Sequence, residues 1–203
     1  TGSAPGNGGG LHITGSADAV ILGGTVNSNV ATREGGGLWN GSGTMTVSGT
    51  MIDSNDAQGP AADDGGAGIF NNGGTLNVQN GTTITNNTAT GASGSGGGIF
   101  STAGVVTIDA SEISTNTSNR AGGGIEIIEG TLNVTNSTVD LNNTGSAPGN
   151  GGGLHITGAA NSNITGGTFN NNTAAREGGG LWNGSGTMTV DGTTVDGNTA
   201  SGP

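Results

Sequence analysis

The chain has 203 residues, of which 47 are glycine, 14 are acidic and only three are basic, and it contains neither cysteine nor lysine. With a formal net charge of -11 it has no basic surface to neutralise phosphates, which excludes nucleic acid as a partner. The absence of cysteine excludes disulfides and thiol chemistry, and no apolar run is long enough for a transmembrane segment.

Two nested repeats dominate the sequence. Residues 144–203 repeat residues 1–60, with 45 of the 60 positions identical, which gives a long period of 143 residues. A shorter unit lies within this period and occurs seven times in the whole chain. A chain this poor in apolar residues would ordinarily be disordered, but a disordered chain would not return an aliphatic residue to the same position in every unit. The periodicity therefore predicts a solenoid, in which each repeat packs against its neighbours.

The short units define the expected coils of one continuous solenoid over residues 1–203. Five of them make up the 143-residue super-repeat, so we expect the chain to be an excerpt of a longer array. In chain order the coils comprise residues 1–31, 32–57, 58–89, 90–118, 119–143, 144–174 and 175–200.

Each coil begins with glycines and an aliphatic residue, continues through a turn of small residues into an alternating segment, and ends with a second alternating segment. Alternation with a period of two predicts short β-strands and not helices. We therefore expect an all-β fold, a right-handed parallel β-helix of about seven coils with three short strands per coil and glycine at the corners.

The expected strands place aliphatic residues toward the interior at equivalent positions. In the first strand of each coil these residues are Leu11, Leu38, Ile69, Ile99, Ile125, Leu154 and Leu181. In the second strand they are the pairs Met45 and Val47, Leu76 and Val78, Val106 and Ile108, Leu132 and Val134, and Met188 and Val190. In the third strand they are Val26, Ile52, Ile84, Ile113, Val139, Phe169 and Val195.

An asparagine follows the third aliphatic position by three residues in every coil. Stacked amides at a turn can hydrogen-bond along the solenoid axis and to the turn backbone, which satisfies groups that a tight corner would otherwise leave unpaired. We therefore expect a structural Asn ladder, made of Asn29, Asn55, Asn87, Asn116, Asn142, Asn172 and Asn198.

Two short motifs carry a resemblance to a known repeat class. Gly37-Leu38, Gly68-Ile69, Gly98-Ile99 and Gly124-Ile125 match a Gly-Gly-aliphatic motif, and Phe169-Asn170-Asn171-Asn172 matches Phe-x-x-Asn. The chain in these respects resembles the repeats of polymorphic outer-membrane proteins and, more broadly, the right-handed β-helices of bacterial surface adhesins with a pectin-lyase-like fold. Six of the seven coils have Ile or Val where that family has Phe, so the resemblance is to the repeat class. It implies a secreted or cell-surface passenger region of bacterial origin, used for adhesion or display.

The residue after the first aliphatic position is expected to point outward, because its neighbour points inward. A row of exposed aromatic and imidazole rings could contact sugar rings or a partner protein. Alternatively, connections fold over the row, or the rings stack on one another and stiffen the rod. The row consists of His12, Trp39, Phe70, Phe100, His155 and Trp182, with Glu126 at the same position in the fifth coil.

Catalysis is not expected from this sequence. Hydrolysis of sugars needs two carboxylates at one site, and the only adjacent acidic pair is Asp63-Asp64. The chain has no lysine to act as a base, and its two histidines lie 143 residues apart in identical contexts, which is repetition and not convergence on one site. We therefore expect neither an enzyme nor a cofactor.

Two further roles stay open as weaker alternatives. Calcium could bind Asp53, Asp140 and Asp196 near the Asn ladder or Asp63-Asp64, but the calcium motif Gly-Gly-x-Gly-x-Asp is absent, which favours acids that solvate the rod. Ice binding would use flat Thr-x-Thr faces, and Thr44-x-Thr46, Thr83-x-Thr85 and Thr187-x-Thr189 fit that pattern. Neighbouring coils interrupt the threonine array.

The function that these observations favour is a rigid stalk or filament, extracellular by the resemblance, at a cell surface or in a matrix. Its partner would be the continuation of the same chain or another copy, associated end to end or side by side. The alternative is a β-helix that binds a glycan or a receptor on a host or neighbouring cell through the aromatic row.

Overall fold

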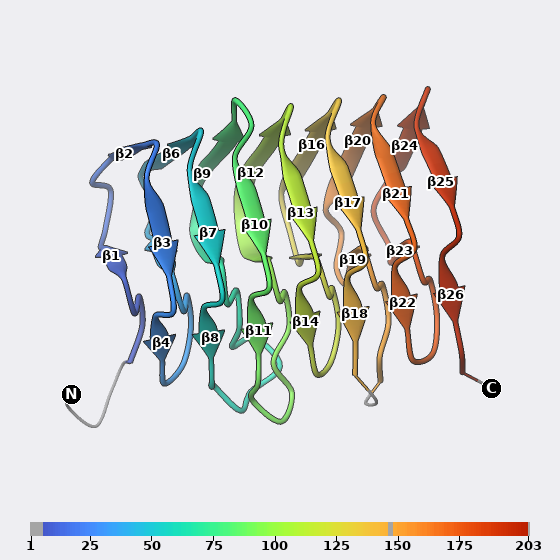
Figure 1. The fold of residues 1–203 in the computed structure, drawn as a ribbon, viewed down its shortest axis with the longest axis horizontal. Coiled ribbons are helices and arrows are strands. Elements are labelled where there is room, and N and C mark those ends of the chain that lie inside the picture. The colour runs from blue at the N-terminus through green and yellow to red at the C-terminus, as the bar shows by residue number, and fades with distance from the viewer. Residues whose placement is uncertain (1–5, 146–147, 203) are drawn as a thin grey trace.

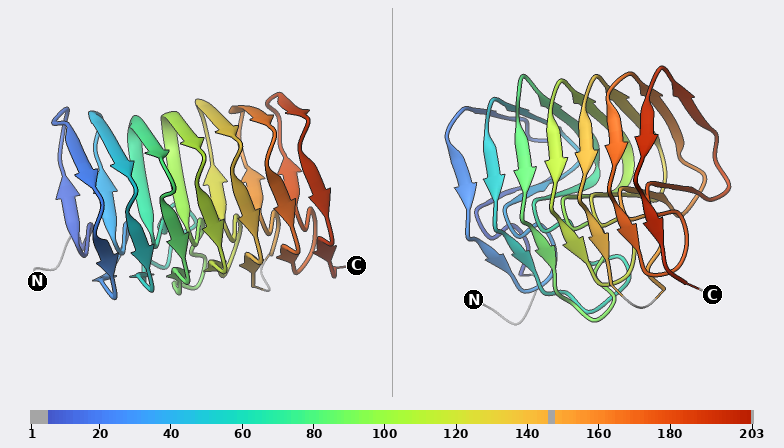
Figure 2. Two further views of the ribbon diagram at one scale, coloured as in Figure 1. Left: turned by 45° about the horizontal axis from the view of Figure 1, so that its top comes forward. Right: turned by 45° about the vertical axis from the view of Figure 1, so that its right-hand side comes forward.

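The computed structural model describes residues 6–145 and 148–202, so the start of the first expected coil and residues 146–147 of the sixth lie outside the described part. In the described residues it contains 26 strands and no helix. Every strand is parallel to the strands with which it pairs, and the chain winds into a rod whose coils follow one another from the N-terminus to the C-terminus (Figures 1 and 2). The predicted all-β parallel solenoid is confirmed.

The first two predicted strands of each coil belong to one 12-stranded sheet. Its path consists of β1 (Leu11–Ile13), β5 (Leu38–Asn40), β9 (Ile69–Gln79), β12 (Ile99–Asp109), β15 (Ile125–Ile127), β19 (Leu154–Ile156) and β23 (Leu181–Asn183). Beside this path lie β2 (Ala19–Leu22), β6 (Thr44–Ser48), β16 (Thr131–Thr135), β20 (Asn161–Thr165) and β24 (Met188–Asp191). In the third and fourth coils the two strands run on as one, β9 and β12, which joins both rows into a single sheet.

The third predicted strand of each coil forms a seven-stranded sheet of its own. It consists of β3 (Thr25–Asn27), β7 (Met51–Asp53), β10 (Thr83–Thr85), β13 (Glu112–Ser114), β17 (Thr138–Asp140), β21 (Thr168–Asn170) and β25 (Thr194–Asp196).

A third sheet, also of seven strands, follows the asparagines and was not predicted. Its strands are two residues long, too short for an alternating pattern, and most end on a buried small residue such as Ala57 or Ala89. They are β4 (Val30–Ala31), β8 (Asp56–Ala57), β11 (Thr88–Ala89), β14 (Thr117–Ser118), β18 (Asn143–Thr144), β22 (Thr173–Ala174) and β26 (Thr199–Ala200).

The strands in the front of Figure 1 run from top to bottom while the coils advance from left to right, which is the right-handed sense of winding. The aliphatic positions stack in register as predicted: Leu38 lies beside Ile69, and Ile52 lies beside Ile84. These side chains form one continuous core that is fully buried in the middle coils. Val26 and Leu181, in the first and last coils, are only half-buried because each has a neighbouring coil on one side alone.

Glycine with positive φ is present at many turns, as at Gly35, Gly49 and Gly81, but one corner of the coils differs from the prediction that glycine would supply it. At the corner before the Asn ladder, glycine is present only as Gly197, and the other coils place a residue with a side chain at positive φ. Short polar side chains tolerate this left-handed conformation best. These residues are Ser28, Ser54, Asn86, Thr115, Leu141 and Asn171. The glycines before the first strand have another role, since a Cβ on Gly37 would lie 2.7 Å from the carbonyl oxygen of Gly68 in the next coil.

The left-handed corner yields a prediction at Leu141, which has a φ of 55° and a side chain that is 53% exposed. Leu141→Gly should raise the free energy of unfolding by about 1 kcal/mol, because glycine adopts this conformation without a Cβ penalty and little packing is lost. Denaturant unfolding measures the change. Leu141→Ala is the control, since alanine keeps the Cβ and should give no gain; an equal gain in both variants would contradict backbone strain as the cause.

Candidate functional site

The row of residues after the first aliphatic position forms one straight column along the rod, which we call the ridge column. Consecutive strands of the first sheet place its members side by side in register. In chain order the ridge column consists of His12, Trp39, Phe70, Phe100, Glu126, His155 and Trp182.

The ridge column is covered, so the expectation of an exposed row was wrong for its five middle members. Trp39 is 8% exposed, Phe70 2% and His155 4%, while Phe100 and Glu126 are fully buried. The glycine-rich connection before each strand folds back over the column. A Cβ placed on Gly35 would lie 3.0 Å from the Cβ of Trp39, for example. Only His12 and Trp182, in terminal coils, are half-buried.

The rings of the ridge column stack on one another along the rod. Ring centroids are 4.2 Å apart between His12 and Trp39, 6.1 Å between Trp39 and Phe70, and 5.2 Å between Phe70 and Phe100, with interplanar angles of 24° or less. The side chain of Ile128 packs against the same cluster. The faces of these rings are therefore occupied by neighbouring rings, as in the stacked alternative considered from the sequence.

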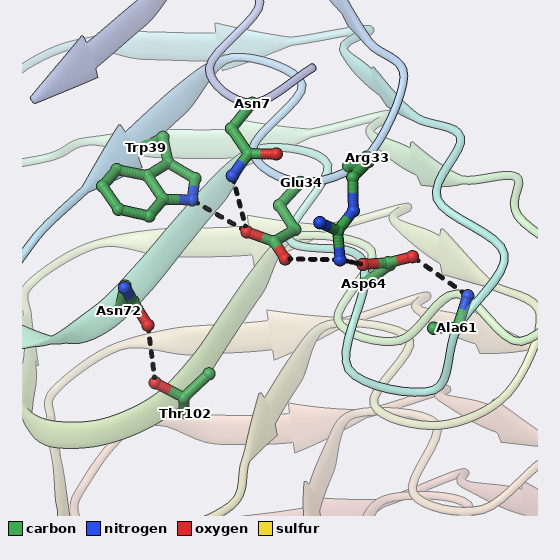
Figure 3. A network of polar contacts seen from close by, with 8 residues as sticks. All are labelled: Asn7, Arg33, Glu34, Trp39, Ala61, Asp64, Asn72 and Thr102. Atoms are coloured by element: carbon green, nitrogen blue, oxygen red, sulfur yellow. Dashed lines mark hydrogen bonds and ion pairs between the residues drawn. The ribbon is translucent and has the colours of Figure 1, made fainter. Parts of the chain in front are cut away.

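A polar network lies where the first connections meet the ridge column (Figure 3). The Nδ2 of Asn7 and the indole Nε1 of Trp39 each donate a hydrogen bond of 3.0 Å to the carboxylate of Glu34. Arg33 donates a hydrogen bond of 3.0 Å to Asp64, and its guanidinium lies 3.6 Å from Glu34. Residues of three successive coils are tied together here.

The electrostatics of this network follow from burial and pairing. Burial raises the pKa of Glu34, and the hydrogen bond from Trp39 and the charge of Arg33 oppose that rise. The hydrogen bond to Asp64 raises the pKa of Arg33. Asp64 was a candidate calcium ligand, but its buried carboxylate is taken by Arg33 and by the backbone N–H of Ala61. The carboxylate thus fixes its own loop to the preceding connection.

The ridge column becomes polar where the fifth coil meets the sixth. The fully buried carboxylate of Glu126 lies 2.8 Å from Nδ1 of His155 and accepts a hydrogen bond from the hydroxyl of Thr157. The same hydroxyl lies 3.0 Å from Nδ1 of His155, and the imidazole stacks on Trp182 at 4.3 Å. Nε2 of His155 is buried without a hydrogen-bond partner. The sequence had placed Glu126 in the row without assigning it a partner.

The Asn ladder has the predicted composition and continuous hydrogen bonding. Asn116, which is fully buried, illustrates its geometry. Its backbone N–H and Nδ2 both donate to Oδ1 of Asn142 at 3.0 Å, and Nδ2 also donates to the carbonyl of Ile84 at 2.8 Å. Its own Oδ1 accepts the corresponding two bonds from Asn87. Each interior amide therefore has all four hydrogen bonds that it can form.

A second polar column, beside the ridge column, was not predicted from the sequence. Nδ2 of Asn40 donates to Oδ1 of Asn71 at 2.7 Å, and Nδ2 of Asn71 donates to the hydroxyl of Ser101 at 2.9 Å. All three side chains are buried beside the ridge column, and their amides also reach backbone carbonyls of the following turn. The available signal was a polar residue two positions after the aliphatic residue in three consecutive coils.

The remaining acidic candidates are dispersed. Asp53, Asp140 and Asp196 occupy one outward column, but polar residues of intervening coils separate them. Hydrogen bonds, that from Asn86 first, lower the pKa of Asp53, whereas burial and then the nearby charge of Glu112 raise the pKa of Asp140. Over residues 6–145 and 148–202 no group of three potential ligands is placed to hold a metal ion.

The threonine pairs also lie in outward columns of the parallel sheet. Thr46 lies beside Asn77, which lies beside Thr107, and the column continues through asparagines of the fifth and sixth coils. The parallel column beginning at Thr44 includes Val105. The array is in register but mixed in composition, as the sequence indicated.

Comparison of the chain with models of protein families, with curated proteins and with solved structures finds no match. Within the described residues, no helix has the length and hydropathy needed to cross a membrane.

The Asn ladder yields a prediction at Asn116. Asn116→Ala should lower the free energy of unfolding by about 3 kcal/mol, because it leaves the donors of Asn87 and the carbonyl of Ile84 buried without partners. Asn29→Ala is the matched control, since Asn29 is only half-buried and water can replace its bonds; we expect a loss of less than about 1 kcal/mol. Equal losses at the two positions would show that burial of the ladder does not set its contribution.

The ridge column yields a second prediction, at Phe70. Phe70→Ala should lower the free energy of unfolding by about 3 to 5 kcal/mol, the range for truncating a buried aromatic residue. Trp182→Ala should cost less, because that ring is half-buried and has one neighbouring ring. Urea unfolding of both variants checks the difference. A Phe70→Ala variant as stable as the unmodified chain would mean that the ridge column is not packed.

Proposed function

We propose that the chain is a structural segment of a rigid rod, which serves as an extracellular stalk or filament at a cell surface or in a matrix. The observation that carries the proposal is the continuous Asn ladder, in which hydrogen-bonded amides join all seven coils and are buried in the five middle ones. Such a ladder resists bending between coils, because displacing one coil breaks buried hydrogen bonds on both of its sides.

The use of the other distinctive residues supports a structural role. The aromatic rings contact each other, Asp64 pairs with Arg33, and Glu126 pairs with His155. In each case the partner belongs to a neighbouring coil, so the interactions hold one coil to the next. Side chains that are engaged in this way are not free to contact a substrate or ligand.

Burial of the ridge column also bears on the choice between a spacer and a glycan-binding β-helix. A sugar ring stacks on the open face of an aromatic side chain, and the faces of Trp39, Phe70 and Phe100 are covered by neighbouring rings and by the connections. Only His12 and Trp182 keep accessible ring surface. The geometry therefore favours the spacer over binding of a glycan or receptor through this column.

The surroundings of such a rod follow from composition and from the resemblance stated above. A net charge of -11 with few basic residues keeps neighbouring rods apart by repulsion and favours solubility. We propose a secreted or cell-surface location in a bacterium, with further coils of the same chain or another copy as the partner. The rod requires no cofactor.

Electron cryomicroscopy of the native filament, isolated from the source cells, tests this proposal. Because equivalent residues of parallel coils lie about 4.8 Å apart, the five-coil super-repeat should produce an axial period of about 24 Å in addition to the 4.8 Å spacing. Antibodies against the chain should label intact cells or the surrounding matrix. Labelling confined to the cell interior, or native material without the longer period, would contradict an extracellular filament built from these coils.

A further inference from the structure

The ridge column and the polar column beside it change character in opposite senses along the rod. In the second, third and fourth coils the ridge residues are aromatic. The next residue of each strand, which we call the inner residue, is Asn40, Asn71 or Ser101. In the fifth and sixth coils the ridge residues are Glu126 and His155, and the inner residues are isoleucines. The second and third coils, and the third and fourth, therefore pair ring with ring in the ridge column and polar with polar in the inner column. The fifth and sixth coils reverse this arrangement, with a polar pair in the ridge column and an apolar pair inside.

The partners of Glu126 come from one side only. Its carboxylate contacts His155 and Thr157 of the sixth coil. On the other side the fourth coil presents Phe100 at the same position, which offers no hydrogen-bond donor. The fully buried carboxylate thus depends on the coil that follows it.

We propose that Glu126, His155 and Thr157 form a coil-pairing site, which determines that a coil of the His-x-Thr type packs on the C-terminal side of the fifth coil. The partner that fits this edge is a second strand of the same repeat that presents an imidazole and a hydroxyl two residues apart. The role holds for coils of one chain and does not depend on the proposed spacer function.

The other coils show why such a site discriminates. The residues at the positions of His155 and Thr157 differ in the other coils. They are Trp39 and Gly41 in the second coil, Phe70 and Asn72 in the third, and Trp182 and Gly184 in the seventh. The fourth coil has the threonine, Thr102, but Phe100 in place of the histidine. None of these coils supplies the imidazole, so packing any of them on the fifth coil would bury the carboxylate without that polar partner. Only the first coil repeats the pair, as His12 and Thr14. Discrimination through the penalty for a wrong neighbour is how polar contacts specify register in other repetitive assemblies.

The contrast between His12 and His155 provides an internal control. Both occur in the sequence Gly-Leu-His-Ile-Thr-Gly, and both stack on a tryptophan, at 4.2 and 4.3 Å. His12 faces no carboxylate in the described structure; its Nδ1 contacts the carbonyl oxygen of Asn7 at 3.1 Å. Effects that arise from pairing with Glu126 should therefore occur at His155 and not at His12.

A double-mutant cycle in the full chain tests the pairing. His155→Phe should lower the ratio of folded to unfolded protein by about a hundredfold or more, because Glu126 is left buried without its partner. The double variant Glu126→Phe with His155→Phe restores a matched, aromatic junction and should recover most of that loss. His12→Phe should change the ratio by less than about tenfold. Additive effects at Glu126 and His155, or a loss at His12 equal to that at His155, would overturn the proposal.

Crosslinking during refolding then tests whether the site specifies order, which a purely stabilising contact would not do. The chain has no cysteine, so introduced pairs report pairing without interference. Thr135→Cys with Thr165→Cys reports the native neighbours, and Thr135→Cys with Asp191→Cys reports a stack in which the seventh coil replaces the sixth.

Each cysteine pair is placed in the unmodified chain and in the Glu126→Phe, His155→Phe background, and disulfides are trapped early in refolding. The proposal expects the slipped crosslink to increase at least tenfold in the double-phenylalanine background, where the ridge column accepts Trp182 as readily as its native neighbour. An equal fraction of slipped crosslink in the two backgrounds would overturn the assignment of a specificity role.

Discussion

The hydrogen bonding of the Asn ladder is the constraint on which the other contacts of the rod depend. Each interior asparagine accepts hydrogen bonds from the preceding coil and donates to the following one, and its amide also donates to a strand carbonyl of the preceding coil. This fixes the separation of the coils and the path of the corner together. Once the corner is fixed, every residue at an equivalent position is brought beside its counterpart, which is the condition for the apolar core, the ring stack and the polar columns to form.

This arrangement explains how a chain with so few apolar residues folds. A conventional globular domain needs a wide apolar interior, whereas a narrow solenoid buries each side chain against its equivalents above and below. Polar residues can then be inside, provided that a neighbouring coil offers a partner. The amides of Asn71 and Asn87 meet that condition through their counterparts, and the carboxylate of Glu126 meets it through His155. Because a buried polar group without a hydrogen-bond partner destabilises the fold, the adjacent coil has to supply that partner.

Much of this fold can be predicted from the sequence, since strict repetition reveals which residues are equivalent. The core positions such as Ile52 and the members of the Asn ladder follow directly, because each position has the same character in successive coils. Alternation also places Trp39 correctly on the outer side of its strand, but it contains no information about what lies over that side. Whether the connection covers the ring depends on backbone conformations such as that of Gly35, which has a φ of 66°. For the same reason the two-residue strands and the left-handed corners were not predictable from an alternating pattern.

The candidate site illustrates a different limit. Glu126, read along the chain, interrupts an aromatic row, and its physical role becomes evident only when the following coil is placed against it. The two near-identical parts of the chain support the same conclusion. Outward residues differ between them, as Val20 and Leu22 of the first coil are replaced by Asn163 and Thr165 in the sixth, while His155 and its neighbours repeat unchanged. A side chain that meets solvent can change alone, whereas a buried polar side chain that pairs with the next coil needs a matching change in its partner, and that coupling limits which polar residues vary in a stack of this kind.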